Sequence, residues 1–148
     1  MAADVYVVKL QTYGNEALFG DLTKGSIILS PMGQIVADEW VNASRNYRDI
    51  KLDRWIVMPS YLRGIVLLPA QAGELASHTL QAPAASGKPR LLSSFVAGFK
   101  AAAAKRINLH RNHPDLPVWQ RNYSETFIPD EVALQRIRCW LQESPDQP

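Results

Sequence analysis

The sequence predicts an α+β fold of the ferredoxin-like kind, in which a split β-α-β-β-α-β series forms one antiparallel sheet with helices on one face. A short N-terminal hairpin and a C-terminal helix are added to this series. Two observations predict the fold: segments rich in β-formers alternate with segments of helical apolar spacing, and only a Met-Pro-Ser corner separates the two middle strands. A third observation, 148 residues of which 47% are hydrophobic, predicts a single domain, 1–148.

The first third of the chain supplies a strand, a hairpin and a helix. Residues 4–13, DVYVVKLQTY, are rich in β-branched and aromatic residues, which indicates a strand. Residues 17–30 contain a Thr-Lys-Gly turn signal, which predicts a short hairpin. Ser30 followed by Pro31 is typical of a helix start, and apolar residues at helical spacing continue to about Arg45.

The middle of the chain supplies two adjacent strands and a long connection. Residues 50–68 form two apolar runs that break at Pro59, where proline suits a strand end because it cannot donate a ladder hydrogen bond. Residues 69–90 are rich in Ala, Pro, Ser and Gly and have no sustained period. We therefore expect 69–90 to be a mobile loop within the domain, because too little chain lies on either side for two cores.

The last third supplies helix, strand and helix. Residues 91–109 carry an apolar stripe at helical spacing, and residues 118–128, VWQRNYSETFI, are typical of a strand. The last helix is expected to begin near Asp130 and to end before Pro145.

The composition predicts a cytoplasmic protein. The formal net charge of +2 permits a polyanionic partner but does not demand one. A single cysteine, Cys139, excludes an internal disulfide and fits a reducing compartment. The N-terminal residues lack the pattern of a signal peptide, and no apolar stretch approaches the roughly 18 residues that span a bilayer, so no membrane association is expected.

Five stretches of the chain occur in a distinctive order and spacing: LFGDLTKGSIILSPMGQIVADEW, LDRWIVMPSYLRGIV, SFVAGFKAAAAKRIN, PVWQRNYSETFI and IRCWLQESP. Together they resemble the REP-associated tyrosine transposases, which belong to the His-hydrophobic-His superfamily of single-strand DNA transposases. The resemblance covers about residues 5–145. It implies the ferredoxin-like fold, single-stranded or hairpin DNA as partner, a homodimer, and a divalent metal such as magnesium or manganese as the family's cofactor.

The residues that carry the chemistry in that family are replaced here. The family binds its metal with two histidines on one strand face after the Met-Pro corner, and a tyrosine on the last helix attacks the phosphate. The histidine places hold Tyr61 and Arg63, the tyrosine place holds Trp140, and a polar helper place one turn later holds Ser144. Arginine has no lone pair to offer, a phenol ionises only near a pKa of about 10, and an indole has no nucleophilic oxygen. We therefore expect no catalytic residue, no bound metal and no cofactor.

Two interpretations of Tyr61 and Arg63 stay open. Positions i and i+2 of a strand share a face, so both side chains should point the same way. In the first interpretation they still face DNA, with Arg63 on a phosphate and Tyr61 stacked on a base. In the second they became ordinary surface residues once cleavage was lost. For Trp140, packing is favoured over recognition.

Basic and aromatic residues in the C-terminal half are the candidates for gripping DNA, as this half does in the family. Trp119 and Tyr123 could stack on unpaired bases. The alternative is a solvated charged surface. His110 and His113 form an H-x-x-H pattern, but no further metal ligands are evident around it. The predicted DNA-binding set is Arg63, Lys100, Lys105, Arg106, Trp119, Arg121, Tyr123, Arg136 and Arg138.

The leading hypothesis is a transposase-like protein that binds single-stranded or hairpin DNA and cannot cleave it. One alternative is a protein-interaction or structural module without DNA binding. Another is an active transposase that uses substitute residues.

Overall fold

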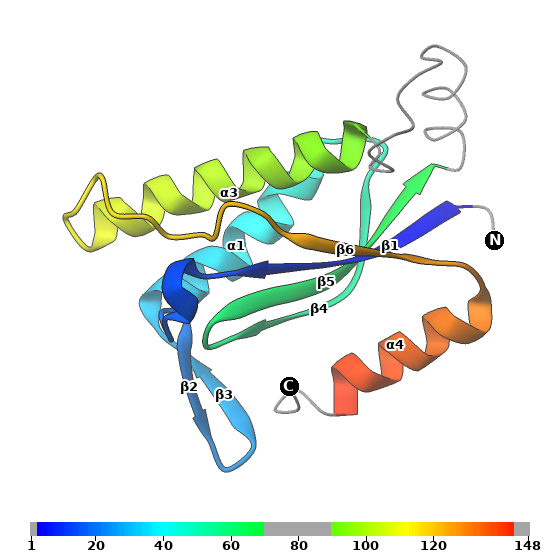
Figure 1. Cartoon of the computed structure of the whole chain (residues 1–148), viewed down its shortest axis with the longest axis horizontal. Coiled ribbons are helices and arrows are strands. Elements are labelled where there is room, and N and C mark those ends of the chain that lie inside the picture. Colours follow the sequence, from blue (N-terminus) through cyan, green and yellow to red (C-terminus); the bar gives the residue numbers. More distant parts are fainter. Residues whose placement is uncertain (1–2, 70–89, 144–148) are drawn as a thin grey trace.

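A four-stranded antiparallel sheet organises the chain in the computed structural model, which describes residues 3–69 and 90–143 (Figure 1). The strand order is β4-β5-β1-β6, and every neighbouring pair is antiparallel. This confirms the predicted fold class. The predicted loop at 69–90 lies almost wholly outside the described residues. The strands are β1 (Ala3–Gln11), β4 (Lys51–Met58), β5 (Tyr61–Pro69) and β6 (Ser124–Ile128).

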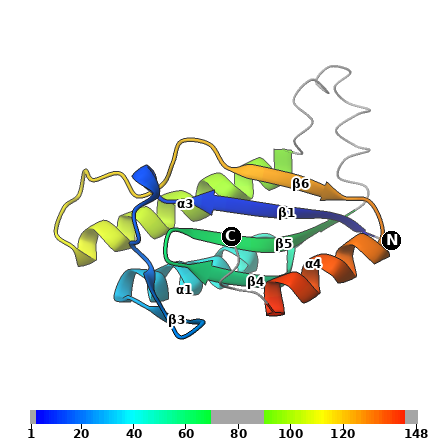
Figure 2. The same cartoon turned by 60° about the horizontal axis from the view of Figure 1, so that its bottom comes forward.

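Helices cover both faces of this sheet (Figures 1 and 2). Helices α1 (Pro31–Arg45) and α3 (Arg90–His110) belong to the β-α-β-β-α-β series and share one face, as predicted. Helix α4 (Glu131–Glu143) packs on the opposite face, which the sequence analysis had left unassigned. No helix in the described ranges combines the length and the apolar character needed to cross a membrane.

A separate hairpin of β2 (Gly20–Thr23) and β3 (Ser26–Leu29) follows a short 3-10 turn, η1 (Tyr13–Asn15). Its two-residue loop, Lys24 and Gly25, has positive φ at both positions, 52° and 78°. A type I′ turn requires this geometry, and it matches the strand twist. The predicted hairpin and its turn are therefore confirmed.

The last strand is shorter than the predicted 118–128. Only Ser124–Ile128 pairs with β1, and Trp119 makes an isolated bridge with Thr12. The amino group of Lys100 on α3 donates to the carbonyl oxygens of Gln120 and Arg121, at 2.8 and 3.3 Å. Gln120 N–H still donates to the Gln11 carbonyl oxygen at 2.9 Å, but residues 121–123 lie outside the register of β6 with β1.

Alternation along β5 divides the apolar residues between two cores. Leu62, Val66 and Leu68 pack toward α1 and α3, whereas Ile65 packs toward α4. The centre of the larger core is Trp40, whose ring meets Phe95 and Phe99 at centroid distances of 5.3 and 5.1 Å. Trp40 reaches this position because it lies against Gly64, which has no side chain to fill the space.

Helix α4 is held on its face by apolar and ionic contacts together. Leu134 and Leu141 are buried against the sheet. Arg138 grips Asp53 with two bonds, Nε to Oδ1 at 3.0 Å and Nη2 to Oδ2 at 2.6 Å. Asp53 and Arg54 lie in a register irregularity of β4, between Leu52 and Trp55. This bulge re-aims Asp53 toward the helix.

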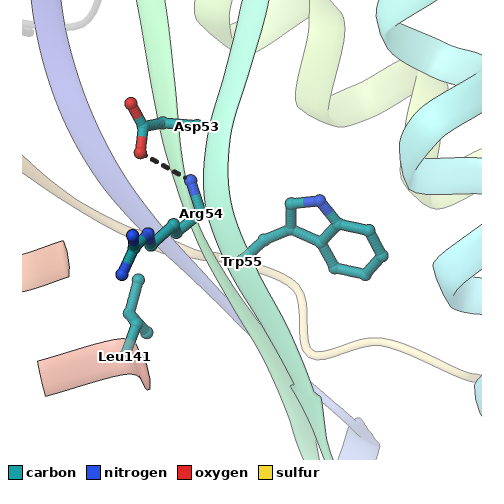
Figure 3. A pocket seen from close by; sticks show the side chains of 4 residues that line it. All are labelled: Asp53, Arg54, Trp55 and Leu141. Atoms are coloured by element: carbon teal, nitrogen blue, oxygen red, sulfur yellow. Dashed lines mark hydrogen bonds between the residues drawn. The ribbon is translucent and has the colours of Figure 1, made fainter. Parts of the chain in front are cut away.

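A cavity of about 510 Å³ adjoins this ionic contact and is lined by Asp53, Arg54, Trp55 and Leu141. Figure 3 shows Asp53, Arg54 and Leu141 on one side of β4, while the ring of Trp55 points to the other. The backbone N–H of Arg54 also donates to Asp53 Oδ1 at 2.7 Å. These hydrogen bonds, that of Arg138 foremost, hold the pKa of Asp53 below its usual value of 3.8.

The contact of Trp40 with Gly64 predicts a strong effect of one methyl group. A Cβ at position 64 would lie 2.9 Å from the Trp55 Cβ and 3.1 Å from the Trp40 ring. We expect Gly64→Ala to destabilise the protein by about 1–3 kcal/mol, as overpacking of a rigid core does. Gly98→Ala, on α3, is the control. A Cβ at position 98 would meet nothing closer than 4.0 Å, so this substitution should stabilise the protein by up to about 1 kcal/mol. Thermal unfolding measures both; equal effects would contradict this account of the core.

The Asp53–Arg138 contact predicts a pH-dependent contribution to stability. The pKa of Asp53 is lower in the folded state than its usual value of 3.8. The Asp53–Arg138 contact therefore stabilises the protein fully at pH values above 3.8, and this stabilisation is lost as the pH falls through the folded-state pKa. Asp53→Asn should therefore lower the free energy of unfolding by about 1–3 kcal/mol near neutral pH. The difference from wild type should shrink in acid. Urea unfolding at several pH values tests this, with the exposed Asp49→Asn as a control that should change little.

Candidate functional site

Two positive side chains lie next to each other on the sheet face beneath α4. Lys9 of β1 and Arg63 of β5 are direct partners across the antiparallel pair, and Ser124 of β6 is the next partner in the same row. All three positions belong to the face that packs toward α4. The row is therefore a consequence of strand register, since side chains alternate between faces along each strand.

Two aromatic rings complete this arrangement. The Arg63 guanidinium carbon lies 4.4 Å from the centre of the Trp140 ring and 5.4 Å from the centre of the Tyr61 ring. Lys9 Nζ lies 4.6 Å from the centre of the Tyr61 ring. We call Lys9, Tyr61, Arg63 and Trp140 the cation–aromatic cluster. Each such contact is worth about 0.5–2 kcal/mol, depending on how far the cation is desolvated.

Among the side chains that the structure describes, no acid balances the charge of this cluster. In the part of the chain that the structure describes, no carboxylate forms an ion pair with Lys9 or Arg63. Burial and the nearby Arg63 charge together lower the pKa of Lys9. The cluster therefore concentrates positive potential at one half-buried point, which favours an anionic ligand.

A cavity of about 310 Å³ opens beside the cluster, between the sheet and α4. The described residues that line it include no Asp or Glu. Two cations, two hydroxyls and four apolar or aromatic side chains form its wall: Lys9, Arg63, Ser124, Thr126, Val7, Ile128, Ile137 and Trp140. Such a lining can hold a ligand that is negatively charged at one end and apolar at the other.

The chemistry of these side chains does not fit a divalent cation. Arg63 and Lys9 bring positive charge where a metal would need anionic or neutral donors, and Trp140 offers only an N–H donor. Within residues 3–69 and 90–143, no three His, Cys, Asp or Glu side chains come together in a group that could hold a metal ion. His110 and His113 are both exposed, and Ser144 lies outside the described residues.

Three predicted DNA-binding cations have partners within the protein. Lys100 donates to the two carbonyls described above, and burial lowers its pKa. Arg106 Nη1 pairs with Asp38 at 2.8 Å and Glu39 at 2.7 Å, which ties α3 to α1. Arg138 pairs with Asp53. These three side chains contribute to the fold in the state described.

The two predicted stacking residues lie against the larger core. Trp119 is only 8% exposed, its ring packs against Phe19 and Phe99, and its Nε1 donates to the Lys100 carbonyl oxygen at 3.2 Å. Tyr123 is half-buried against the same core, and burial raises its pKa. Neither ring faces the cation–aromatic cluster, because both belong to the side of the sheet that carries α1 and α3.

Three predicted cations are exposed: Lys105 on α3, Arg121 before β6, and Arg136 on α4. Lys105 and Arg63 lie on opposite sides of the sheet, so the predicted set does not form one continuous patch with the cluster. The structure does bring together Tyr61, Arg63 and Trp140. The sequence analysis had placed Tyr61 and Arg63 on one strand face and had added Trp140 by resemblance alone. The DNA-binding roles of the whole set stay predictions.

Sequence reasoning missed Lys9, Ser124 and Thr126. One signal for Lys9 was present, a lysine within the apolar run VYVVKL. Its importance depends on pairing with Arg63, 54 positions later in the chain, and the alternating pattern alone does not fix that register.

Comparisons with known proteins place the fold. No protein-family model matches the chain. An uncharacterized protein of Haemophilus influenzae (strain ATCC 51907 / DSM 11121 / KW20 / Rd) is 28% identical over 144 residues, which cover 95% of this chain and 79% of that protein.

Two solved structures share the architecture. A REP-associated tyrosine transposase bound to a REP hairpin has a TM-score of 0.53 and 13% identity, over 100% of this chain and 76% of that one. A candidate transposase from Deinococcus radiodurans R1 has a TM-score of 0.50 and 16% identity, over 97% and 92% of the two chains. This protein therefore has a transposase-like fold.

Proposed function

We propose that this protein binds single-stranded or hairpin DNA on the sheet face beneath α4 and does not cleave it. The observation that carries the proposal is the pair of unbalanced cations, Lys9 and Arg63, set against two aromatic rings. Phosphates are the anions that arginine and lysine recognise in nucleic acids, arginine by a forked pair of hydrogen bonds. The similar structure bound to a REP hairpin supports DNA as the class of polyanion.

The aromatic members of the cluster favour unpaired DNA over a regular duplex. A base can stack on a protein ring only when it is not stacked and paired within a duplex. Tyr61 is half-buried at the start of β5, and one wall of the adjoining cavity is the Trp140 ring. A single strand or the loop of a hairpin can present both a phosphate and a free base there.

The proposed lack of cleavage follows from what the cluster cannot supply. Breaking a phosphodiester in the manner of the resembling family needs a metal that polarises the phosphate and an oxygen nucleophile. Arg63 cannot ligate a metal, Trp140 has no oxygen, and Lys9 adds a second positive charge that repels a divalent cation. Binding can survive these replacements because a fixed guanidinium charge attracts a phosphate without any metal.

The homodimer implied by the resemblance is a further proposal, which light scattering of the purified protein would test.

DNA binding should depend on salt and on the cluster. We expect labelled hairpin and single-stranded oligonucleotides to bind more tightly than duplex in fluorescence anisotropy. The logarithm of affinity should fall linearly with the logarithm of salt concentration. Arg63→Ala and Lys9→Ala should each reduce that slope by about one. The exposed Arg48→Ala, in the loop between α1 and β4, removes the same charge elsewhere and should leave the slope nearly unchanged. Absence of binding at low salt would exclude the DNA proposal and favour a protein-interaction module.

Cleavage should be absent in the same preparations. End-labelled hairpin incubated with magnesium or manganese should show neither a shorter product nor a covalent protein–DNA adduct on a denaturing gel. The reason is that the cluster provides no metal-ligand pair, and that position 140, where the resembling family has its attacking tyrosine, holds a tryptophan. An adduct would instead favour an active transposase with substitute residues, and Tyr61→Phe and Tyr123→Phe would then identify the attacking oxygen.

A further inference from the structure

We infer that the cavity between the sheet and α4 is a pocket for one nucleotide with a terminal phosphate, either a free nucleoside monophosphate or the phosphorylated end of a DNA strand. The assignment of a DNA end as the ligand rests on the proposed function. The assignment of a free mononucleotide does not depend on the proposed function.

The size of the cavity selects a single nucleotide. Its volume is about 310 Å³, which lies at the small end of the roughly 300–1,000 Å³ range of ligand pockets. A single nucleotide is enough to fill such a space, and any further nucleotides would lie outside it. One nucleotide inserted from a strand end fits without bending the strand, whereas an internal nucleotide requires the backbone to enter and leave through the same opening.

The charge of the pocket selects a phosphate monoester over a diester. Lys9 and Arg63 bring two positive charges, and no described lining residue is acidic. A phosphodiester inside a strand carries one negative charge, whereas a terminal phosphate carries about 1.5 to 2 near neutral pH. Only the monoester balances both cations. Burial, and to a smaller extent the neighbouring Arg63 charge, lower the pKa of Lys9, and a bound dianion would oppose both effects.

The remaining lining matches the rest of a nucleotide. Ser124 and Thr126 are two residues apart on β6 and therefore share the pocket face, so their hydroxyls can donate to phosphate or sugar oxygens. Ile128, Ile137 and Trp140 form an apolar and aromatic wall for the sugar and base. The polar groups all come from the sheet, whereas the apolar groups come half from the sheet, Val7 and Ile128, and half from α4, Ile137 and Trp140.

Calorimetric titration of the full chain tests the pocket with defined probes. The probes are thymidine 5′-monophosphate, thymidine 3′-monophosphate, thymidine and inorganic phosphate. We expect at least one monophosphate to bind, thymidine not to bind, and inorganic phosphate to bind at least about tenfold more weakly, since it lacks the apolar contacts. Arg63→Gln should weaken the monophosphate by about 10- to 100-fold. Thr126→Val, which keeps the side-chain shape at an exposed position, should weaken it less, and Arg48→Ala should not change it.

The same hairpin with a 5′-phosphate, a 3′-phosphate or hydroxyl ends then separates the two sources of the phosphate. Tighter binding of one phosphorylated hairpin, lost in Arg63→Gln, would support a DNA end as the ligand. Binding of a mononucleotide without any DNA binding would support a free nucleotide and would overturn the proposed function alone. Equal binding of all hairpins with no mononucleotide bound would overturn the pocket and leave DNA binding standing. Equal affinity for phosphate and nucleotide would overturn the nucleotide assignment.

Discussion

The register between β1 and β5 is the constraint on which both the core and the candidate site depend. It places Leu10 opposite Leu62 on the side of α1 and α3, and Lys9 opposite Arg63 on the side of α4. A slip of one residue in either strand would turn its cation into the larger core and its leucine toward α4. Burial of an unpaired cation among apolar side chains costs several kcal/mol, so the packing of the core enforces the position of the cations. The side-by-side placement of Lys9 and Arg63 is thus a by-product of correct folding and needs no separate organising interaction.

Helix α4 turns the second face of the sheet from a surface into a site. Without it, Lys9 and Arg63 would be exposed side chains whose charge water screens. The helix is anchored on the β4 side by Arg138 and Asp53 and along its length by buried leucines, and it holds Trp140 over Arg63. The Trp140 ring covers part of the guanidinium from solvent and strengthens the local field. The residues that anchor the helix, Arg138, Asp53 and the buried leucines, are not members of the cluster. The helix can therefore be held firmly while the cavity beside Trp140 stays open.

Local signals were sufficient for the elements apart from the extent of the last strand, and non-local pairing decided the site. Ser30 caps α1 by accepting from the Gly33 N–H at 3.1 Å, and Asp130 caps α4 from the Ala133 N–H at 2.9 Å, as the sequence predicted. The basic residues show where such reasoning fails. Arg106 and Arg138 are unexceptional charges in sequence, yet their partners Glu39 and Asp53 lie 67 and 85 positions away. Whether a cation is free to bind a ligand depends on the residues that lie next to it in the folded chain. Residue type and spacing in the sequence do not reveal these neighbours.

Under the proposed function, the side chains at positions 61, 63 and 140, which differ from those of the resembling family, have a common physical meaning. A metal held by histidines polarises a phosphate most strongly in the transition state, so its binding energy lowers the barrier to bond breaking. A guanidinium and an ammonium attract the same phosphate in its ground state, but they provide no Lewis acid and no nucleophile at the correct side of the phosphorus. Their binding energy therefore stabilises the complex with the intact ligand, which raises the affinity and leaves the phosphodiester bond unbroken. Under the proposed function, Arg63 provides permanent positive charge and Tyr61 an uncharged ring at the two places where the resembling family has metal ligands, so the site retains a phosphate and does not react with it. Under the proposed function, the second cation, Lys9, strengthens that retention, because it adds attraction for the anion and repels a divalent cation.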